Sequence, residues 1–163
     1  MTLKKLSSLF AVTAFWCLSG AAQAQVPQYG ANISHEQARK ALAGAIADAR
    51  KQNLPMAVTV VDNAGQLVAF ERMDNTQTAS IAVSQDKAVS AAIYRRSTKV
   101  FQDALAAAGA GLRILTLRGA SAVEGGLPIM LDGKVVGGIG VSGGSAEQDG
   151  VVAKAGLDGM VAK

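Results

Sequence analysis

The chain has 163 residues and a formal net charge of +4, from 16 basic and 12 acidic residues. So small a positive excess gives no support for nucleic acid or an acidic membrane surface as a partner. The length is ample for one domain but not for two.

The first 24 residues have the features of a secretory signal peptide. Two lysines (Lys4–Lys5) precede an apolar run over 9–18 that is too short to cross a membrane, and Ala22-Gln23-Ala24 offers small residues to signal peptidase. We therefore predict an exported protein, periplasmic or secreted, that begins at Gln25 and has no membrane span. The single cysteine and the single tryptophan lie in the signal segment, so we expect no disulfide in the mature chain.

Residues 25–33 suggest a flexible N-terminal arm, and the single folded domain is predicted over 34–163. Ser34 and Gln37 form a capping box that opens a helix reaching about Gln52. Pro55 ends that helix. Two strands rich in β-branched residues follow, joined as a hairpin by a tight turn at 62–65; they are 56–62 and 66–73.

The second half of the chain is predicted to hold three helices and three strands. The expected helices are 79–96, 98–108 and a C-terminal one from the capping box at 145–148 to about 161. The expected strands are 113–120, 127–132 and 134–143, the last two joined by an Asp132-Gly133 turn. The order α-β-β-α-α-β-β-β-α lacks sustained βαβ alternation, which favours an α+β fold with a five-stranded antiparallel sheet and helices packed on it.

A glycine-rich stretch, GIGVSG at 138–143, matches the G-x-G-x-x-G pattern of dinucleotide-binding folds. That pattern needs a βαβ unit with an acidic residue at the end of a second strand, and too little chain follows to supply one. We interpret Gly138 and Gly140 instead as strand positions that mark a bulge or that another backbone or a flat ligand approaches closely.

Three longer segments carry a resemblance to a known family: VVDNAGQLVAFERMDNT (60–76), DKAVSAAIYRRST (86–98) and GGLPIMLDGKVVGGIGVSGGSAEQDGVVAKAGL (125–157). They resemble the GlcG/HbpS family of haem-binding and haem-degrading proteins, which includes the C-terminal domain of PduO-type proteins. The resemblance implies a profilin-like fold, homo-oligomers, and haem or another tetrapyrrole as the ligand of some members. It also implies that some members work outside the cytoplasm.

If haem binds, several side chains are candidate iron ligands. His35 is the only histidine and stands at a helix start, where the dipole favours the neutral imidazole that metals require; it is otherwise a solvated helix-start residue. Met73, Tyr94 and Met130 are further candidates that can equally fill a core or an interface. The resemblance links Thr98 to haem binding in some members; its alternative role is to cap the next helix.

Basic residues are candidates for pairing with the haem propionates. They are Arg72, Arg95, Arg96 and Lys99. The adjacent Arg95 and Arg96 can instead serve a helix C-terminus.

The sequence gives little support for classical catalysis. The mature chain has no cysteine nucleophile and no metal cluster with zinc spacing. Weak catalytic candidates are Lys87, Asp62 and Asp74, which fall in the family-like segments. Lys87 is a buried catalytic amine or a surface lysine, and Asp62 is more simply a turn residue.

We therefore predict an exported, oligomeric haem-binding or haem-degrading protein. Few large side chains and no disulfide suggest that copies associate as a dimer or a multiple of one. Two alternatives remain open. One is an enzyme or binding protein for another small molecule, such as a corrinoid or a small organic acid. The other is an assembly protein without a dedicated ligand.

Overall fold

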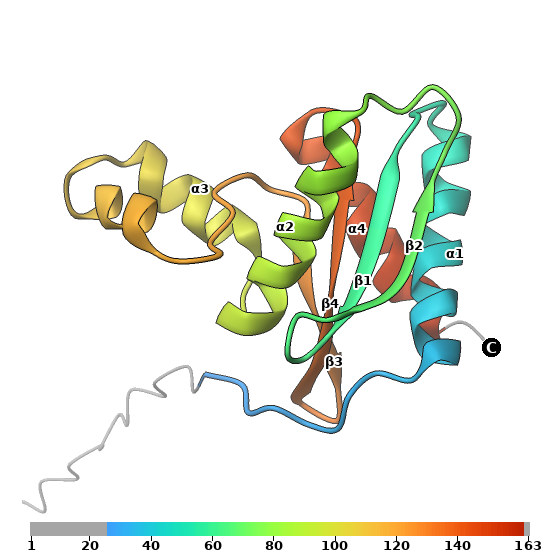
Figure 1. Cartoon of the computed structure of the whole chain (residues 1–163), viewed down its shortest axis with the longest axis horizontal. Helices are drawn as coiled ribbons and strands as arrows, with labels where there is room; N and C mark the ends of the chain where they lie inside the picture. Colours follow the sequence, from blue (N-terminus) through green and yellow to red (C-terminus); the bar gives the residue numbers. More distant parts are fainter. Residues whose placement is uncertain (1–25, 162–163) are drawn as a thin grey trace, which may run out of the picture.

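The computed structural model describes residues 26–161, so the predicted signal peptide and its cleavage point lie outside the described residues. The fold is α+β (Figure 1). Four antiparallel strands form one sheet in the order β2-β1-β4-β3. Their bounds are β1 Ala57–Asp62, β2 Leu67–Arg72, β3 Gly126–Leu131 and β4 Lys134–Ser142.

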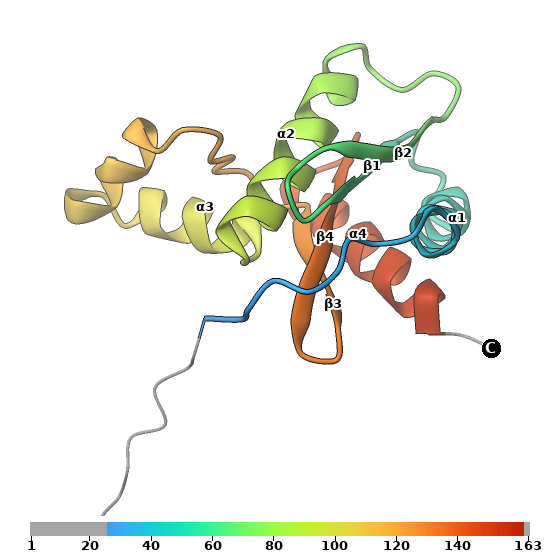
Figure 2. The same ribbon diagram turned by 60° about the horizontal axis from the view of Figure 1, so that its bottom comes forward.

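Helices cover both faces of the sheet. They are α1 His35–Lys51, α2 Ala79–Tyr94, α3 Thr98–Ala106, the 3₁₀ helix η1 Gly109–Thr116 and α4 Ala146–Val161. Helices α1 and α4 pack together on one face, and α2 lies on the other (Figures 1 and 2). Helices α3 and η1 pack on each other and project beyond α2 as a lobe, which we call the α3–η1 lobe (Figure 1). No helix within 26–161 is long and apolar enough to cross a membrane.

The predicted fifth strand at 113–120 is wrong. Residues up to Thr116 belong to η1, and the chain then continues without regular structure to β3. Ile114 is the only buried residue of η1, whereas Leu115 and Leu117 are exposed. A strand needs alternate side chains to face a core, and these residues lie beside α3 and the end of α2 instead of beside the sheet. The described part of the chain therefore has four strands where we expected five.

Small residues set the spacing between the helices and the sheet. On α1, Ala38, Ala41, Ala45 and Ala49 are completely buried. A side-chain carbon added at Gly44 would lie 2.9 Å from the carbonyl oxygen of Ala155 on α4. The two backbones therefore approach more closely than larger residues would allow, which gives a chain with few large side chains a dense core.

The glycines of β4 allow α2 to lie directly on the sheet. A side-chain carbon at Gly138 would collide with the carbonyl oxygen of Ala88 and lie 3.0 Å from the amide nitrogen of Ala92. One at Gly140 would collide with the backbone of Ser84 and Ala88. The predicted close approach of another backbone is confirmed, and that backbone is α2. The space beside both glycines is thus filled by the chain itself.

The segment 26–33, for which we predicted a flexible arm, lies along β4 in this structure. The amide of Gly30 donates to the carbonyl oxygen of Val135 at 2.8 Å, and the amide of Ile33 donates to that of Val136 at 2.9 Å. Strand β1 pairs with β4 only as far as Asp62 opposite Gly137. The arm therefore satisfies the backbone groups of β4 that β1 leaves open.

Candidate functional site

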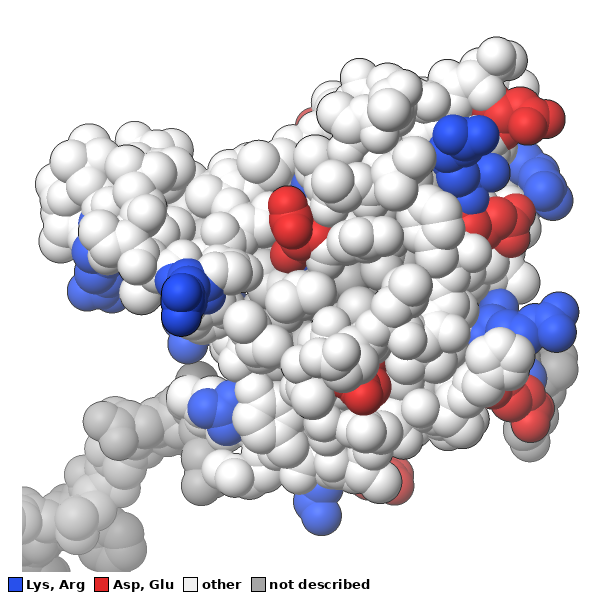
Figure 3. Space-filling model, viewed as in Figure 1, with Lys and Arg blue, Asp and Glu red and all other residues white. Residues whose placement is uncertain are grey.

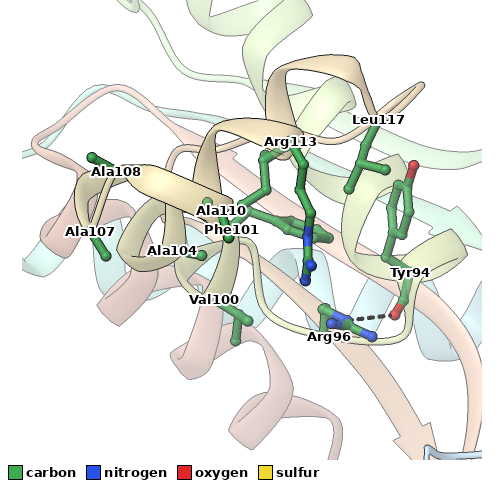
Figure 4. Close-up of a pocket in the computed structure, with 12 residues that line it drawn as sticks. Tyr94, Arg96, Val100, Phe101, Ala104, Ala107, Ala108, Ala110, Arg113 and Leu117 are labelled. Atoms are coloured by element: carbon green, nitrogen blue, oxygen red, sulfur yellow. Dashed lines mark hydrogen bonds between the residues drawn. The ribbon is translucent and has the colours of Figure 1, made fainter.

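The α3–η1 lobe holds a mostly apolar pocket of about 620 Å³. Its walls include Val100, Phe101 and Leu117 together with several alanines, and its polar side chains are Tyr94, Arg96 and Arg113 (Figure 4). Figure 4 shows Arg113 reaching from η1 toward Arg96. Where the lobe is visible in Figure 3, its surface is largely uncharged and the charges present are basic. The pocket can thus take a flat apolar molecule with an anionic edge.

Aromatic contacts hold one wall of this pocket. The rings of Tyr94 and Phe101 meet edge to face, with centroids 5.1 Å apart, a favoured geometry for aromatic pairs. The Tyr94 hydroxyl donates to the carbonyl oxygen of Arg118 at 2.7 Å. The Arg96 guanidinium lies 5.8 Å from the centre of the Phe101 ring. These contacts tie the end of α2, the start of α3 and the segment after η1 into one unit.

The backbone at the end of α2 separates two neighbouring arginines. Arg95 caps α2 in the left-handed conformation, with φ of 55°, which is uncommon for a residue other than glycine. Arg96 lines the pocket. Arg95 instead donates to the carbonyl oxygen of Pro27 at 3.0 Å and lies 5.0 Å from the Tyr29 ring centre. Only Arg96 of this pair is available to a ligand in the pocket.

Thr98 is the first residue of α3 and is completely buried. Its Oγ1 accepts a hydrogen bond from the amide of Gly126 at 2.9 Å. The expected alternative role, capping α3, belongs to Ser97, whose side chain accepts from the amide of Lys99. In this structure Thr98 therefore joins the lobe to β3.

The remaining propionate candidates lie away from the pocket. Arg72 is exposed at the end of β2, in a shallow cleft that Asp74 also lines. Lys99 pairs with Asp103, with Nζ 2.7 Å from Oδ1. This hydrogen bond raises the pKa of Lys99. Neither Arg72 nor Lys99 lines the lobe pocket.

The candidate iron ligands are dispersed over the molecule. His35 is exposed at the start of α1, on the face of the sheet opposite α2 (Figure 1). Met73 packs against the main core, and Met130 lines a separate depression beside α4. Tyr94 is the one candidate ligand in the pocket. The structure thus brings Tyr94 and Arg96 together and leaves His35 of the same chain far from them.

Two of the three catalytic candidates, Asp62 and Lys87, have structural partners. Oδ1 of Asp62 accepts from the amides of Ala64 and Gln66, both at 2.9 Å, so its predicted role as a turn residue is confirmed. Asp74 is exposed. Lys87 is fully buried and contacts Asp149, with Nζ 2.6 Å from Oδ2. Its surface alternative is therefore wrong. Among residues 26–161, no three His, Cys, Asp or Glu side chains gather as a metal site.

The Lys87–Asp149 pair is enclosed by backbone groups. Lys87 Nζ also donates to the carbonyl oxygen of Val141 at 3.0 Å, and Oδ1 of Asp149 accepts from the amide of Gly144 at 2.9 Å. Burial raises the pKa of Asp149, although the bond from Lys87 opposes this shift. The pair therefore joins α2, β4 and α4.

Sequence reasoning missed Asp149, Arg113 and Phe101. A signal for Asp149 existed: it falls at helical spacing with Val152, Ala153 and Gly156, which form the buried face of α4. A carboxylate on the buried face of a helix needs a buried cation as its partner. No comparable signal marked Arg113, because the segment was interpreted as a strand.

Comparisons with known proteins agree with the fold and its motifs. Residues 33–158 match the family model described as haem degrading protein HbpS-like. The chain is 34% identical to protein GlcG of Escherichia coli strain K12 over 110 residues, covering 68% of this chain and 81% of GlcG.

Two solved structures are also similar. The crystal structure of HbpS superposes with a TM-score of 0.73 at 29% identity, covering 80% of this chain and 92% of the other. The haem complex of PduOC gives 0.71 at 26% identity, covering 78% and 94%. The motifs, the fold and these matches together show that the chain belongs to the HbpS-like family.

Proposed function

We propose that this protein binds haem in the pocket of the α3–η1 lobe. The observation that carries the proposal is the pocket itself: an apolar space with two arginines, Arg96 and Arg113, among its lining residues. Membership of the HbpS-like family and similarity to the haem complex of PduOC support haem over other flat anions.

The residues present fit this ligand. The cavity volume of about 620 Å³ falls in the usual range for small-molecule sites. The apolar walls would cover the faces of the ring and keep water away, and the two guanidinium groups would pair with the propionates. Tyrosine is a known haem-iron ligand, which makes Tyr94 the candidate from within the chain. Bound haem would supply redox and oxygen chemistry at this site.

We also propose that the protein is exported and self-associates. The signal-like segment at 1–24 supports export to the periplasm or beyond. Association would bring surfaces of a second copy to the lobe, where Leu112 and Leu115 are exposed. It is also the arrangement in which His35, remote from the pocket of its own chain, would reach haem.

A haemin titration followed by absorbance tests the proposal. We expect a Soret band that shifts and saturates at a fixed ratio of haem to protein. Arg113→Ala should weaken binding by about tenfold to a hundredfold, since losing a charge-assisted bond costs roughly 1.5–3 kcal/mol. Arg72→Ala is the matched control, because Arg72 is also exposed but lies outside the pocket. Binding that never saturates, or equal losses in the two variants, would contradict the proposed site.

A further inference from the structure

The N-terminal arm reaches the end of α2 as well as β4. The Tyr29 hydroxyl donates to the carbonyl oxygen of Ile93 at 2.7 Å. Ile93 is the penultimate residue of α2, and the last four carbonyl groups of a helix have no partner inside it. Tyr29 therefore satisfies one of these groups from another part of the chain.

A second contact holds the residue that follows α2. The Arg95 guanidinium makes a cation–π contact with the Tyr29 ring and donates a hydrogen bond to the carbonyl oxygen of Pro27. Both partners belong to the arm. Arg95 stands in the left-handed conformation, which costs free energy for a residue with a side chain. The arm contacts offset this cost.

The residues on either side of Arg95 line the ligand pocket. Tyr94 precedes it and Arg96 follows it, and both are pocket residues. The backbone conformation of Arg95 sets the direction of both side chains. Contacts that hold the Arg95 backbone therefore also hold Tyr94 in the aromatic wall of the pocket and Arg96, one of its two cationic groups.

We propose that the N-terminal arm is a positioning strap for the haem pocket, with Tyr29 as its positioning residue. The inference rests on the proposed function, since it assigns the arm to that site. Tyr29 acts through the end of α2, and the pairing of the arm with β4 gives it a fixed base. Asn63 secures that base, because its Nδ2 donates to the carbonyl oxygen of Gly30 at 2.8 Å.

Two variants loosen the strap without touching the pocket. Tyr29→Phe keeps the ring and removes the hydroxyl that bonds Ile93. Asn63→Ala releases the arm at Gly30. The matched control is Thr76→Val, which removes a hydroxyl that donates to the carbonyl oxygen of Met73 at 2.8 Å, before α2 begins. Each of the three variants removes a side-chain donor to a backbone carbonyl oxygen.

Two measurements separate positioning from general stability. One is hydrogen–deuterium exchange of residues 94–117 in the haem-free protein, followed by mass spectrometry. The other is haem affinity with the position of the Soret band. We expect the strap variants to speed exchange in 94–117 and to weaken haem binding by about threefold or more, a loss of roughly 0.7 kcal/mol. Thr76→Val should change neither.

The exchange and binding results distinguish a failure of the proposed haem binding from a failure of the proposed strap. If the unmodified protein takes up no haem but the strap variants still speed exchange in 94–117, the proposed function fails and the strap stands. If the variants only lower the melting temperature, with lobe exchange and haem affinity equal to those of Thr76→Val, the strap is overturned.

Discussion

The buried Lys87–Asp149 pair offers a sharp test of the structure. Lys87→Met leaves the Asp149 carboxylate enclosed without its cation, since the two side chains are only 1% and 4% exposed. Breaking a buried pair by removing one partner costs about 3–5 kcal/mol, a large part of the roughly 5–15 kcal/mol that stabilises a typical domain. Asp149→Asn should cost a similar amount, because Lys87 then remains buried without a counter-charge.

The double variant separates charge from packing. Lys87→Met with Asp149→Asn contains no buried charge, so its loss should be smaller than the sum of the single losses by about 2 kcal/mol or more. Urea unfolding at neutral pH, followed by circular dichroism, measures all three free energies.

An exposed pair provides the matched control. Lys154 Nζ lies 2.7 Å from Asp158 Oδ2, but the two side chains are 69% and 64% exposed. Lys154→Met should therefore cost no more than about 1 kcal/mol. If the Lys87 and Asp149 losses simply add, or match that of Lys154→Met, the pair does not hold the core in the way described.

Two further outcomes are expected. Gly138→Val should lower the free energy of unfolding by about 1–3 kcal/mol or more by pushing α2 off β4. Gly150→Ala is the control, because the atoms nearest to its added carbon belong to the flexible Glu124 side chain. Equal melting temperatures of the two variants would contradict this expectation. His35→Ala should leave haem binding by an isolated monomer unchanged and should alter the Soret band only in an associated form. Light scattering gives the state of association and absorbance gives the Soret band. A changed Soret band in a pure monomer would contradict the placement of His35.

The end signals of helices were predictable because they act over a few residues. The capping box of α1 forms as expected between Ser34 and Gln37. The one before α4 forms between Ser145 and Gln148. In such a box the side chains and backbone groups that bond each other are three residues apart, so the sequence alone brings them together.

The candidate site was predictable only in part. Tyr94 and Arg96 were named from the sequence, and both line the pocket. Arg95, adjacent to Arg96 and identical in chemistry, turns to the arm because of one left-handed backbone conformation. Arg113 reaches the pocket because 113–116 coils against α3 instead of joining the sheet. Residue type alone predicts neither the direction of Arg95 nor the position of Arg113 in the pocket.

The sequence by itself determined the local features of this protein: its helix caps and the Asp132-Gly133 turn between β3 and β4. These depend on backbone dihedral preferences and on hydrogen bonds between near neighbours. Tertiary structure decided that α2 fills the space over Gly138 and that Lys87 meets Asp149. It also decided that a pocket forms where α2, α3 and η1 meet. Each of these contacts joins segments that are far apart in the chain. They depend on which surfaces can be buried together without leaving a charge or a backbone group unpaired.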